Sequence, residues 1–398
     1  MLQLLGVLLA FAIVLGLRVR DVDFSVALLV ASVVIGLTSG KPLSIFIDVA
    51  YRTFTDPTTF VLCAAVILIT ILGYSLKETG LMTDLIDGLK ELLPSRVLLS
   101  LIPALFGLLS IPGGALMSAP FNEPEADRLG LKPEHKTYVN VWFRHLWYWA
   151  SPISNIPILA SSLAGFTLMN FLSVQLPLFA ATIAIGFIVS SSFIKGRGNN
   201  ERTPKSIYDT SKGLAPIVAA ISLGIAGLPI YGSLAVGIVL VFLLKHVPVT
   251  NAIRMMREGV RWDVAASVVA MLYFRYMVVG AGSVNSLFQS IADAGVPLLI
   301  LFMVVPLFIG ALSGTPTMGI GIVFPLLVPL SGVSSIHLVS IIYAGIIAGY
   351  LASPMHLCLI LTNGYYKSEL GKVYNYLVPS VAALYVVNVV YHLMMNGF

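Results

Sequence analysis

Long apolar runs constrain the fold of this chain more than any other feature. An apolar helix of about 20 residues spans the hydrocarbon core of a bilayer, and we interpret ten segments as crossings. They are 1–16, 23–39, 57–76, 138–165, 171–194, 214–229, 231–245, 264–281, 337–364 and 373–395. The chain is 58% hydrophobic and 10% charged, against about 25% charged in soluble domains. We therefore predict an all-α polytopic membrane protein and exclude an ordinary soluble enzyme.

Two further apolar regions, 95–121 and 296–330, are interrupted near their middles. The interruptions are the runs SIPGG at 110–114 and SGTPT at 313–317. We predict that each region is a re-entrant helical hairpin, which enters the membrane and leaves it on the same side.

The basic residues set the predicted orientation, because cytoplasmic loops are enriched in Lys and Arg. With both termini outside, 19 of the 23 Lys and Arg residues lie on the cytoplasmic side. Counting either hairpin as a full crossing would invert every later segment and remove this bias. We therefore predict a multi-pass protein of the cell membrane. The net charge of +5 reflects this sidedness and predicts no nucleic-acid partner.

The chain resembles itself at an offset of about 202 residues. The run PALFGLLS at 103–110 matches PLFIGALS at 306–313, and Ala-Ser-Pro at 150–152 recurs at 352–354. Each unit holds five crossings and one hairpin. Since five is odd, the second unit is expected upside down, as an inverted-topology repeat.

The repeat also sets the predicted boundaries. The first unit covers 1–190, a cytoplasmic linker covers 191–213, and the second unit covers 214–398. Within the first unit we place early spans at 1–78, an amphipathic segment at 80–93, a hairpin and broken span at 95–165, and a span at 171–190. Within the second we place early spans at 214–281, a hairpin at 296–330, a broken span at 337–364 and a last span at 373–395.

Two crossings are predicted to be broken helices, at SPISNIP (151–157) and SPMH (353–356). Non-helical backbone at membrane depth survives only where protein or a water-filled cavity surrounds it. Ser followed by Pro suits the first positions of a helix, so a half-helix is expected to begin after Ser151, after Ser353 and, in the second hairpin, after Thr315. Helix N-termini favour an anion, while carbonyls and hydroxyls at helix ends can bind Na⁺.

These breaks and hairpin tips supply the candidate site. The candidate substrate-binding residues are Ser110, Gly113, Gly114, Ser118, Arg144, Asn155, Thr315, Thr317, His356, Thr362 and Asn363. The candidate ligands of two Na⁺ ions, one per repeat, are Ser110, Ser151, Ser154, Ser313, Gly314 and Ser353. No other cofactor is predicted.

Ionisable residues within spans are functional candidates by default. Arg144 is interpreted as an anion clamp, as a partner of Glu123, or as an interface residue in an aromatic belt. Glu123 and His356 are candidate coupling residues, although a buried histidine is often purely structural. For Arg275, a structural ion pair or a dimer contact is favoured over substrate binding.

The runs LSIPGGALMSAPFNEPEADRLG (109–130) and VNVWFRHLWYWASPISNIP (139–157) resemble an uncharacterised archaeal and bacterial integral-membrane family of the ion-transporter superfamily. That superfamily includes divalent anion:sodium symporters, gluconate permeases and arsenite permeases. The resemblance implies a scaffold domain from the early spans, a mobile transport domain from the hairpins and broken spans, elevator-type movement, and homodimers. The hairpin tips depart from the Ser-Asn-Thr signature of dicarboxylate symporters.

The sequence favours a secondary transporter, coupled to Na⁺ or H⁺, for a small anion such as an organic acid. An intramembrane enzyme is the first alternative, but no HExxH, GxSxG or paired intramembrane aspartates occur. An ion channel is the second, and two inverted hairpins suit alternating access better.

Overall fold

The structure is a computed structural model that describes residues 2–20, 22–108, 114–195, 203–282, 295–331 and 335–396. Every regular element within these ranges is a helix. Those of the first half are α1 (Leu2–Val19), α2 (Phe24–Thr38), α3 (Ile45–Thr55), α4 (Pro57–Glu78), α5 (Leu81–Leu92), α6 (Ser95–Leu108), α7 (Gly114–Arg128), α8 (Pro133–Arg144), η1 (Leu146–Tyr148), α9 (Asn155–Ala164) and α10 (Leu168–Ser191). Those of the second half are α11 (Pro204–Ile225), α12 (Ile230–Leu244), α13 (Val249–Glu258), α14 (Trp262–Gly280), α16 (Leu298–Ser313), α17 (Pro316–Leu327), η2 (Pro329–Ser331), α18 (Ile336–Ala352), α19 (Leu357–Tyr366) and α20 (Leu370–Asn396).

Apolar helices dominate this architecture, as the sequence predicts. In the described ranges, five segments are long and apolar enough to cross a membrane, and several shorter apolar helices accompany them. The five are Pro57–Glu78, Leu168–Ser191, Trp262–Gly280, Ile336–Tyr366 and Leu370–Met395. The fold is that of an all-α polytopic membrane protein. The total of ten crossings stays a prediction. Helices such as α2 and α12 are shorter than the length at which a helix spans a membrane, so length alone does not identify them as crossings.

Most predicted elements occur where the sequence places them, and the predicted linker is the main correction. Residues 204–213 of that linker are helical, because α11 begins at Pro204 and not at 214. Thr203 accepts a hydrogen bond from the Ser206 backbone and Ser206 accepts one from the Thr203 backbone, which forms a capping box. This local start signal lies upstream of the apolar run, so hydropathy alone misses it. Likewise, α7 continues to Arg128, past the expected end of the hairpin at 121.

Helices α1–α4 and α6–α10 of the first half have counterparts in the same order in the second half, α11–α14 and α16–α20, and their contacts correspond. Helix α2 packs on α1 and α14, while α12 packs on α11 and α4. Helices α6 and α8 form the same pair as α16 and α18. The repeat-equivalent helices α4 and α14 contact each other, and so do α10 and α20. Helices that the sequence offset relates are therefore neighbours across the two halves.

Glycine contacts repeat between the halves down to single atoms. A Cβ at Gly107 of α6 would overlap the Arg144 carbonyl oxygen of α8, and a Cβ at Gly310 of α16 would overlap the Ile346 carbonyl oxygen of α18. These pairs are related by the same offset of about 202 residues that the sequence shows. The first arm of each predicted hairpin, α6 or α16, therefore packs directly against the backbone of the broken span in its own repeat.

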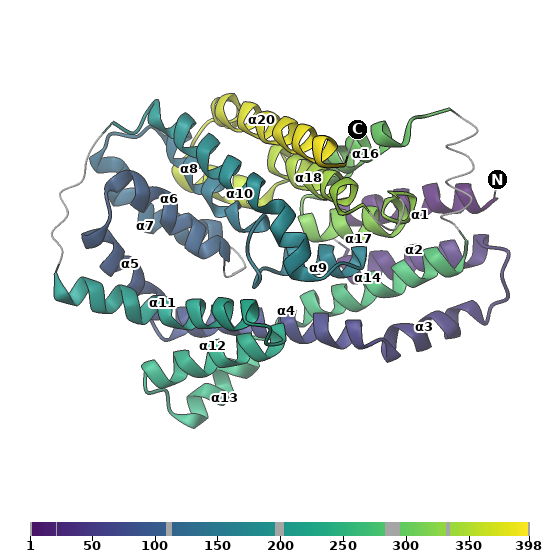
Figure 1. The fold of residues 1–398 in the computed structure, drawn as a ribbon, viewed down its shortest axis with the longest axis horizontal. Helices are drawn as coiled ribbons and strands as arrows, with labels where there is room; N and C mark the ends of the chain where they lie inside the picture. The colour runs from purple at the N-terminus through teal and green to yellow at the C-terminus, as the bar shows by residue number, and fades with distance from the viewer. Residues whose placement is uncertain are drawn as a thin grey trace.

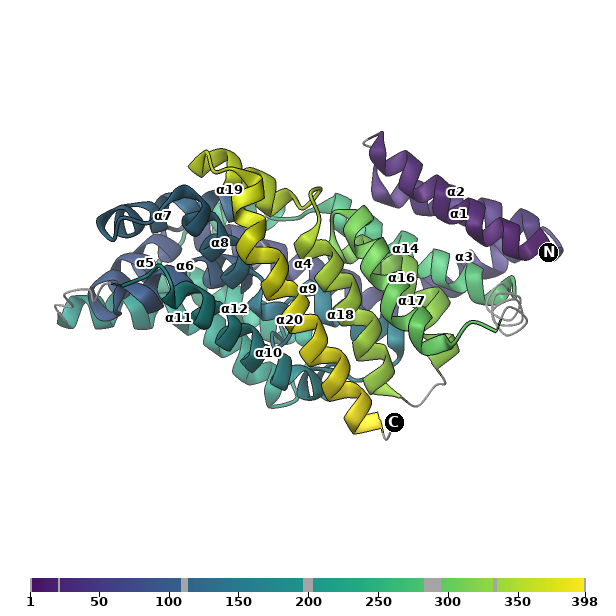
Figure 2. The same cartoon turned by 90° about the horizontal axis from the view of Figure 1, so that it is seen from above.

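The helices divide into two groups (Figures 1 and 2). In Figure 1, helices α6, α8, α10, α16, α18 and α20 lie in the upper part of the molecule, and α3, α4, α11, α12 and α13 lie below them. Contacts of α9 with α4 and of α17 with α14 connect the groups. The helices of the predicted hairpins and broken spans thus contact the early helices α4 and α14 through α9 and α17.

Substituting Ala for Gly107 or Gly310 is expected to lower the free energy of unfolding by about 1–3 kcal/mol, because the added methyl group meets backbone that cannot move aside. The measurement is thermal unfolding of the purified protein in detergent. Gly364→Ala is the matched control, since a Cβ there meets nothing within 4 Å. Equal melting temperatures for all three variants would contradict the packing described here.

Candidate functional site

Both predicted breaks are present, and each separates two half-helices. The first lies between the end of α8 at Arg144 and the start of α9 at Asn155, and the second lies between α18 and α19. The expectation that helices begin directly after Ser151 and Ser353 is wrong. Each serine instead closes a turn: the Ser151 hydroxyl accepts a hydrogen bond from the Ile153 N–H (3.2 Å) and the Ser353 hydroxyl from the Met355 N–H (3.0 Å). Serine turns of this kind compete with helix capping.

The residues that do cap the half-helices are Ser154 for α9 and His356 for α19, which are equivalent in the repeat. Both side chains are fully buried, and neither makes a capping hydrogen bond. The Ser154 hydroxyl and both ring nitrogens of His356 have no hydrogen-bond partner among the described residues. Buried polar atoms are nearly always paired, so these two equivalent unpaired groups at helix N-termini are candidates for contact with a ligand.

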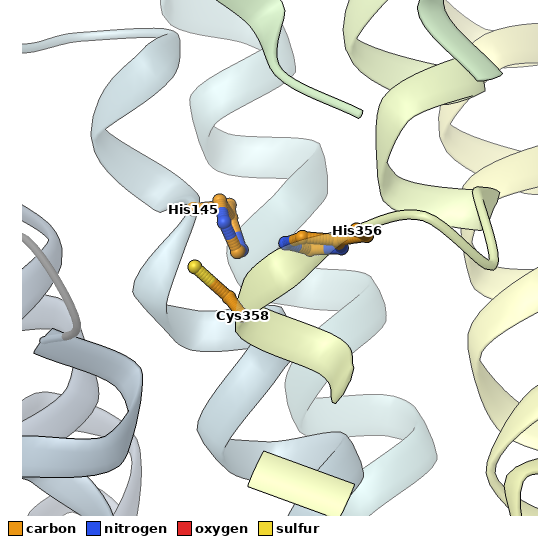
Figure 3. Close-up of side chains that lie close together, drawn as sticks. All are labelled: His145, His356 and Cys358. Atoms are coloured by element: carbon orange, nitrogen blue, oxygen red, sulfur yellow. The ribbon is translucent and has the colours of Figure 1, made fainter. Parts of the chain in front are cut away.

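The two breaks touch each other through aromatic rings. The ring centroids of Tyr148 and Tyr350, another repeat-equivalent pair, are 6.4 Å apart. Those of His145 and His356 are 4.8 Å apart, and His356 lies 4.1 Å from Tyr350. Figure 3 shows His145 and His356 side by side, from different elements. The breaks of both repeats therefore build one central region.

Arg144 contributes positive charge to this region. It is the last residue of α8 and is only 7% exposed. The next residue in the chain is His145, whose ring lies 4.8 Å from that of His356. Among the Asp, Glu, Lys, Arg and His side chains of the described residues, those that are buried are Arg144, His145, His356 and His392. The charge of the centre therefore suits an anion.

The tip of the second hairpin packs on the second break. Gly314 adopts the left-handed conformation that ends α16 (φ +66°), and a Cβ there would lie 3.1 Å from the Met355 carbonyl oxygen. The Ser353 hydroxyl donates to the Ala311 carbonyl oxygen. Ser313 donates to the Thr315 carbonyl oxygen at 3.0 Å. Ser313, Gly314 and Ser353 are thus brought together.

Thr315 caps α17, which begins after it at Pro316, as predicted. Its side chain accepts a hydrogen bond from the Met318 N–H at 3.4 Å, and Pro316 occupies the first helical position. Thr315 is exposed and Thr317 is half-buried, so a ligand at the tip could reach both.

The first hairpin joins the centre through a residue that sequence reasoning missed, Asn140. The Ser118 hydroxyl of α7 donates to Asn140 Oδ1 (2.7 Å), and Asn140 Nδ2 donates to Thr362 Oγ1 of α19 (3.1 Å). All three side chains are buried. The available signal was an amide inside the apolar run 138–143. At the tip itself, Ser110 and Gly113 lie outside the described residues, and Gly114 is the first residue of α7.

Three other candidates lie away from the centre. Glu123 accepts a hydrogen bond from the Tyr365 hydroxyl at 2.6 Å, and Asn363 accepts one from Ser368 at 2.6 Å. Both bonds lie at the end of α19 opposite His356. Arg275 lines a cavity of about 190 Å³ beside Phe324 and Val339.

Both the sequence and the fold of this chain have known relatives. Residues 2–394 match the family described as "protein of unknown function (DUF401)". The chain belongs to this family. It is also similar to the solved structure of the Alcanivorax borkumensis YdaH transporter, reported with an unusual topology. The TM-score is 0.63 and the identity 13%, over 83% of this chain and 85% of that chain. A comparison with curated proteins gives no match. The DUF401 chain therefore has a fold found in a membrane transporter.

Replacing Asn140 by Leu is expected to lower the free energy of unfolding by about 1–3 kcal/mol, because buried polar groups on α7 and α19 lose their shared partner. Thermal unfolding measures the effect. Asn170→Leu on the exposed start of α10 is the control and should change stability little. If the two variants unfold alike, Asn140 does not link the hairpin to the broken span.

Proposed function

We propose that this protein is a cation-coupled secondary transporter of a small anion, such as an organic acid. The observation that carries the proposal is the pair of unpaired, buried capping residues Ser154 and His356 at the starts of α9 and α19. A bound anion would accept hydrogen bonds from the free N–H groups of these two half-helices. The fold shared with a solved transporter supports transport over catalysis or channel activity.

The anion would lie between the two breaks, close to the rings of Tyr148 and Tyr350. Arg144 would supply the compensating charge, and Thr315 and Thr317 would face the anion from the second hairpin tip. Because His356 is buried next to Arg144 and His145, it would bind as a neutral imidazole that donates one hydrogen bond. Asn155, Ser118 and Thr362 would hold the surrounding helices in place.

The coupling ion would bind where helices end. Ser353, Ser313 and Gly314 gather at the end of α16 and α18, and hydroxyl and carbonyl oxygens are the ligands that Na⁺ takes in such sites. Ser151 and Ser154 would serve the equivalent position in the first repeat, together with Ser110. Proton coupling through His356 or Glu123 is the alternative that the pH arm of the test separates.

The division of the helices supports an elevator-type movement. Hairpins and broken spans would form the transport domain, and α1–α4 with α11–α14 would form the scaffold and the dimer contact. In this proposal the repeat is inverted, and the chain is a member of the ion-transporter superfamily and a homodimer of the cell membrane.

The first test is a thermal-shift screen of the purified protein. Carboxylates, sugar acids and oxyanions are added with and without Na⁺ at two pH values. At least one anion should raise the melting temperature, more strongly with Na⁺ or at the lower pH. Failure of every anion under every ion condition would overturn the proposal.

Uptake of the stabilising anion into proteoliposomes then tests the site. Ser154→Ala and His356→Gln should each lower uptake at least tenfold, because each removes a group at a helix N-terminus. Ser191→Ala, on the exposed end of α10, is the matched control and should transport normally. Unimpaired uptake in both site variants would exclude the breaks as the binding site.

The proposed orientation is tested with single cysteines in a chain lacking Cys63 and Cys358. A cysteine replacing Met395, which is exposed near the end of α20, should react with an impermeant maleimide in intact cells. A cysteine replacing Lys205, exposed at the start of α11, should react only after permeabilisation. The reverse pattern would place the termini inside.

A further inference from the structure

Three side chains able to bind a transition metal meet at the second break. The ligand atoms of His145, His356 and Cys358 all lie within 4.8 Å of one another. Figure 3 shows the two imidazoles and the thiol facing a common point. His145 follows the last residue of α8, His356 caps α19, and Cys358 lies in the first turn of α19. The three residues therefore come from both repeats.

The hydrogen bonds of His145 direct its free nitrogen toward this point. Nδ1 lies 2.6 Å from the Val141 carbonyl oxygen, and since a carbonyl can only accept, Nδ1 carries the proton. Nε2 is then left with its lone pair, and it lies 3.4 Å from the Tyr350 hydroxyl. A histidine that donates through one nitrogen to a backbone carbonyl and binds a metal through the other is a common arrangement in metal sites.

The second donor is His356, whose ring nitrogens are left unpaired by the described residues. It is 0% exposed, and neither ring nitrogen has a hydrogen-bond partner among the described residues. Leaving a buried polar group unpaired costs about 1–3 kcal/mol. A metal bond to one nitrogen would remove that cost.

Cys358 supplies the third donor. Its thiol is half-buried, and the Tyr350 hydroxyl lies 3.9 Å from the sulfur. Tyr350 thus stands beside both His145 and Cys358, so its oxygen is placed near a fourth coordination position. Binding would release the thiol proton, since the thiolate is the ligand form. The thiolate charge would also offset the nearby charge of Arg144.

We propose that His145 Nε2, a ring nitrogen of His356 and Cys358 Sγ form a binding site for a transition-metal ion of the Zn²⁺ class. Tetrahedral zinc takes nitrogen at about 2.0 Å and sulfur at about 2.3 Å, which separates ligand atoms by about 3.5 Å. The side chains therefore need to approach by about 1 Å. Two imidazoles and a thiolate select such ions over Na⁺, which takes oxygen ligands. The bound metal would join α8 of the first repeat to α19 of the second.

The proposal goes beyond the transport function and does not rest on it. The test uses the purified full-length chain, freed of metal with a chelator and titrated with Co²⁺. One equivalent should bind and give visible d–d bands with a thiolate-to-cobalt charge-transfer band. Added Zn²⁺ should remove both. Absence of stoichiometric binding would overturn the proposal whether or not the protein transports an anion.

Variants assign the ligands. Cys358→Ser, which exchanges one atom, should abolish the charge-transfer band, and His145→Gln and His356→Gln should weaken binding at least tenfold. Cys63→Ser, which alters the other cysteine in the chain, is the matched control and should behave as the natural protein does. Retention of the thiolate band in Cys358→Ser, or its loss in Cys63→Ser, would overturn the assignment.

A second pair of histidines supplies a competing outcome. His337 and His392 face each other with Nδ1 atoms 3.0 Å apart. If Co²⁺ binds without a thiolate band, and His392→Gln abolishes that binding while Cys358→Ser does not, the ion belongs to this pair and the proposed site is wrong. Size-exclusion chromatography and melting temperature of each metal-free variant separate loss of a ligand from loss of the fold.

Discussion

The backbone at each helix break is the constraint on which the rest of this structure depends. Inside a membrane, a peptide group without a partner has no water to bind, so a broken span has to be enclosed by protein. Here the second break is held by the second hairpin, through Ser353 and Gly314. The enclosure leaves polar groups of Ser154 and His356 without a partner among the described residues, and the proposed transport function rests on these two groups.

The repeat turns two such breaks into one site. Residues of the two halves that the sequence offset relates meet at the centre, and Tyr148 and Tyr350 are the clearest pair. The halves then differ where chemistry is needed. The position equivalent to Ser154 holds His356, and Arg144 and Ile346 occupy matching places against Gly107 and Gly310. A symmetric scaffold with asymmetric side chains can present charge, hydroxyl and imidazole groups to the same small volume.

Sequence patterns predicted the elements well and their ends less well. Helices cover both arms of the two predicted hairpins and the predicted amphipathic segment, and two apolar runs are broken where expected. Hydropathy and interruptions by Ser, Gly and Pro are local properties, so the sequence carries them. The starts of α9 and α19 were misplaced, because Ser151 and Ser353 bond to the backbone of their own turns. Of the candidate residues, Ser118 and Thr362 do approach each other, but through Asn140, whose one sequence signal was that it is an amide inside an apolar run. Glu123 and Asn363 lie at the far end of α19 instead.

The sequence by itself determined that the chain is a duplicated bundle of apolar helices interrupted at matching points, since length, hydropathy and an offset of about 202 residues are properties of the chain alone. Only the tertiary structure decided which polar side chains share a space. His145 and His356 are 211 residues apart in the chain, and packing of the two halves brings their rings to 4.8 Å. Such contacts depend on how helices of separate repeats pack, and no local sequence pattern encodes that packing.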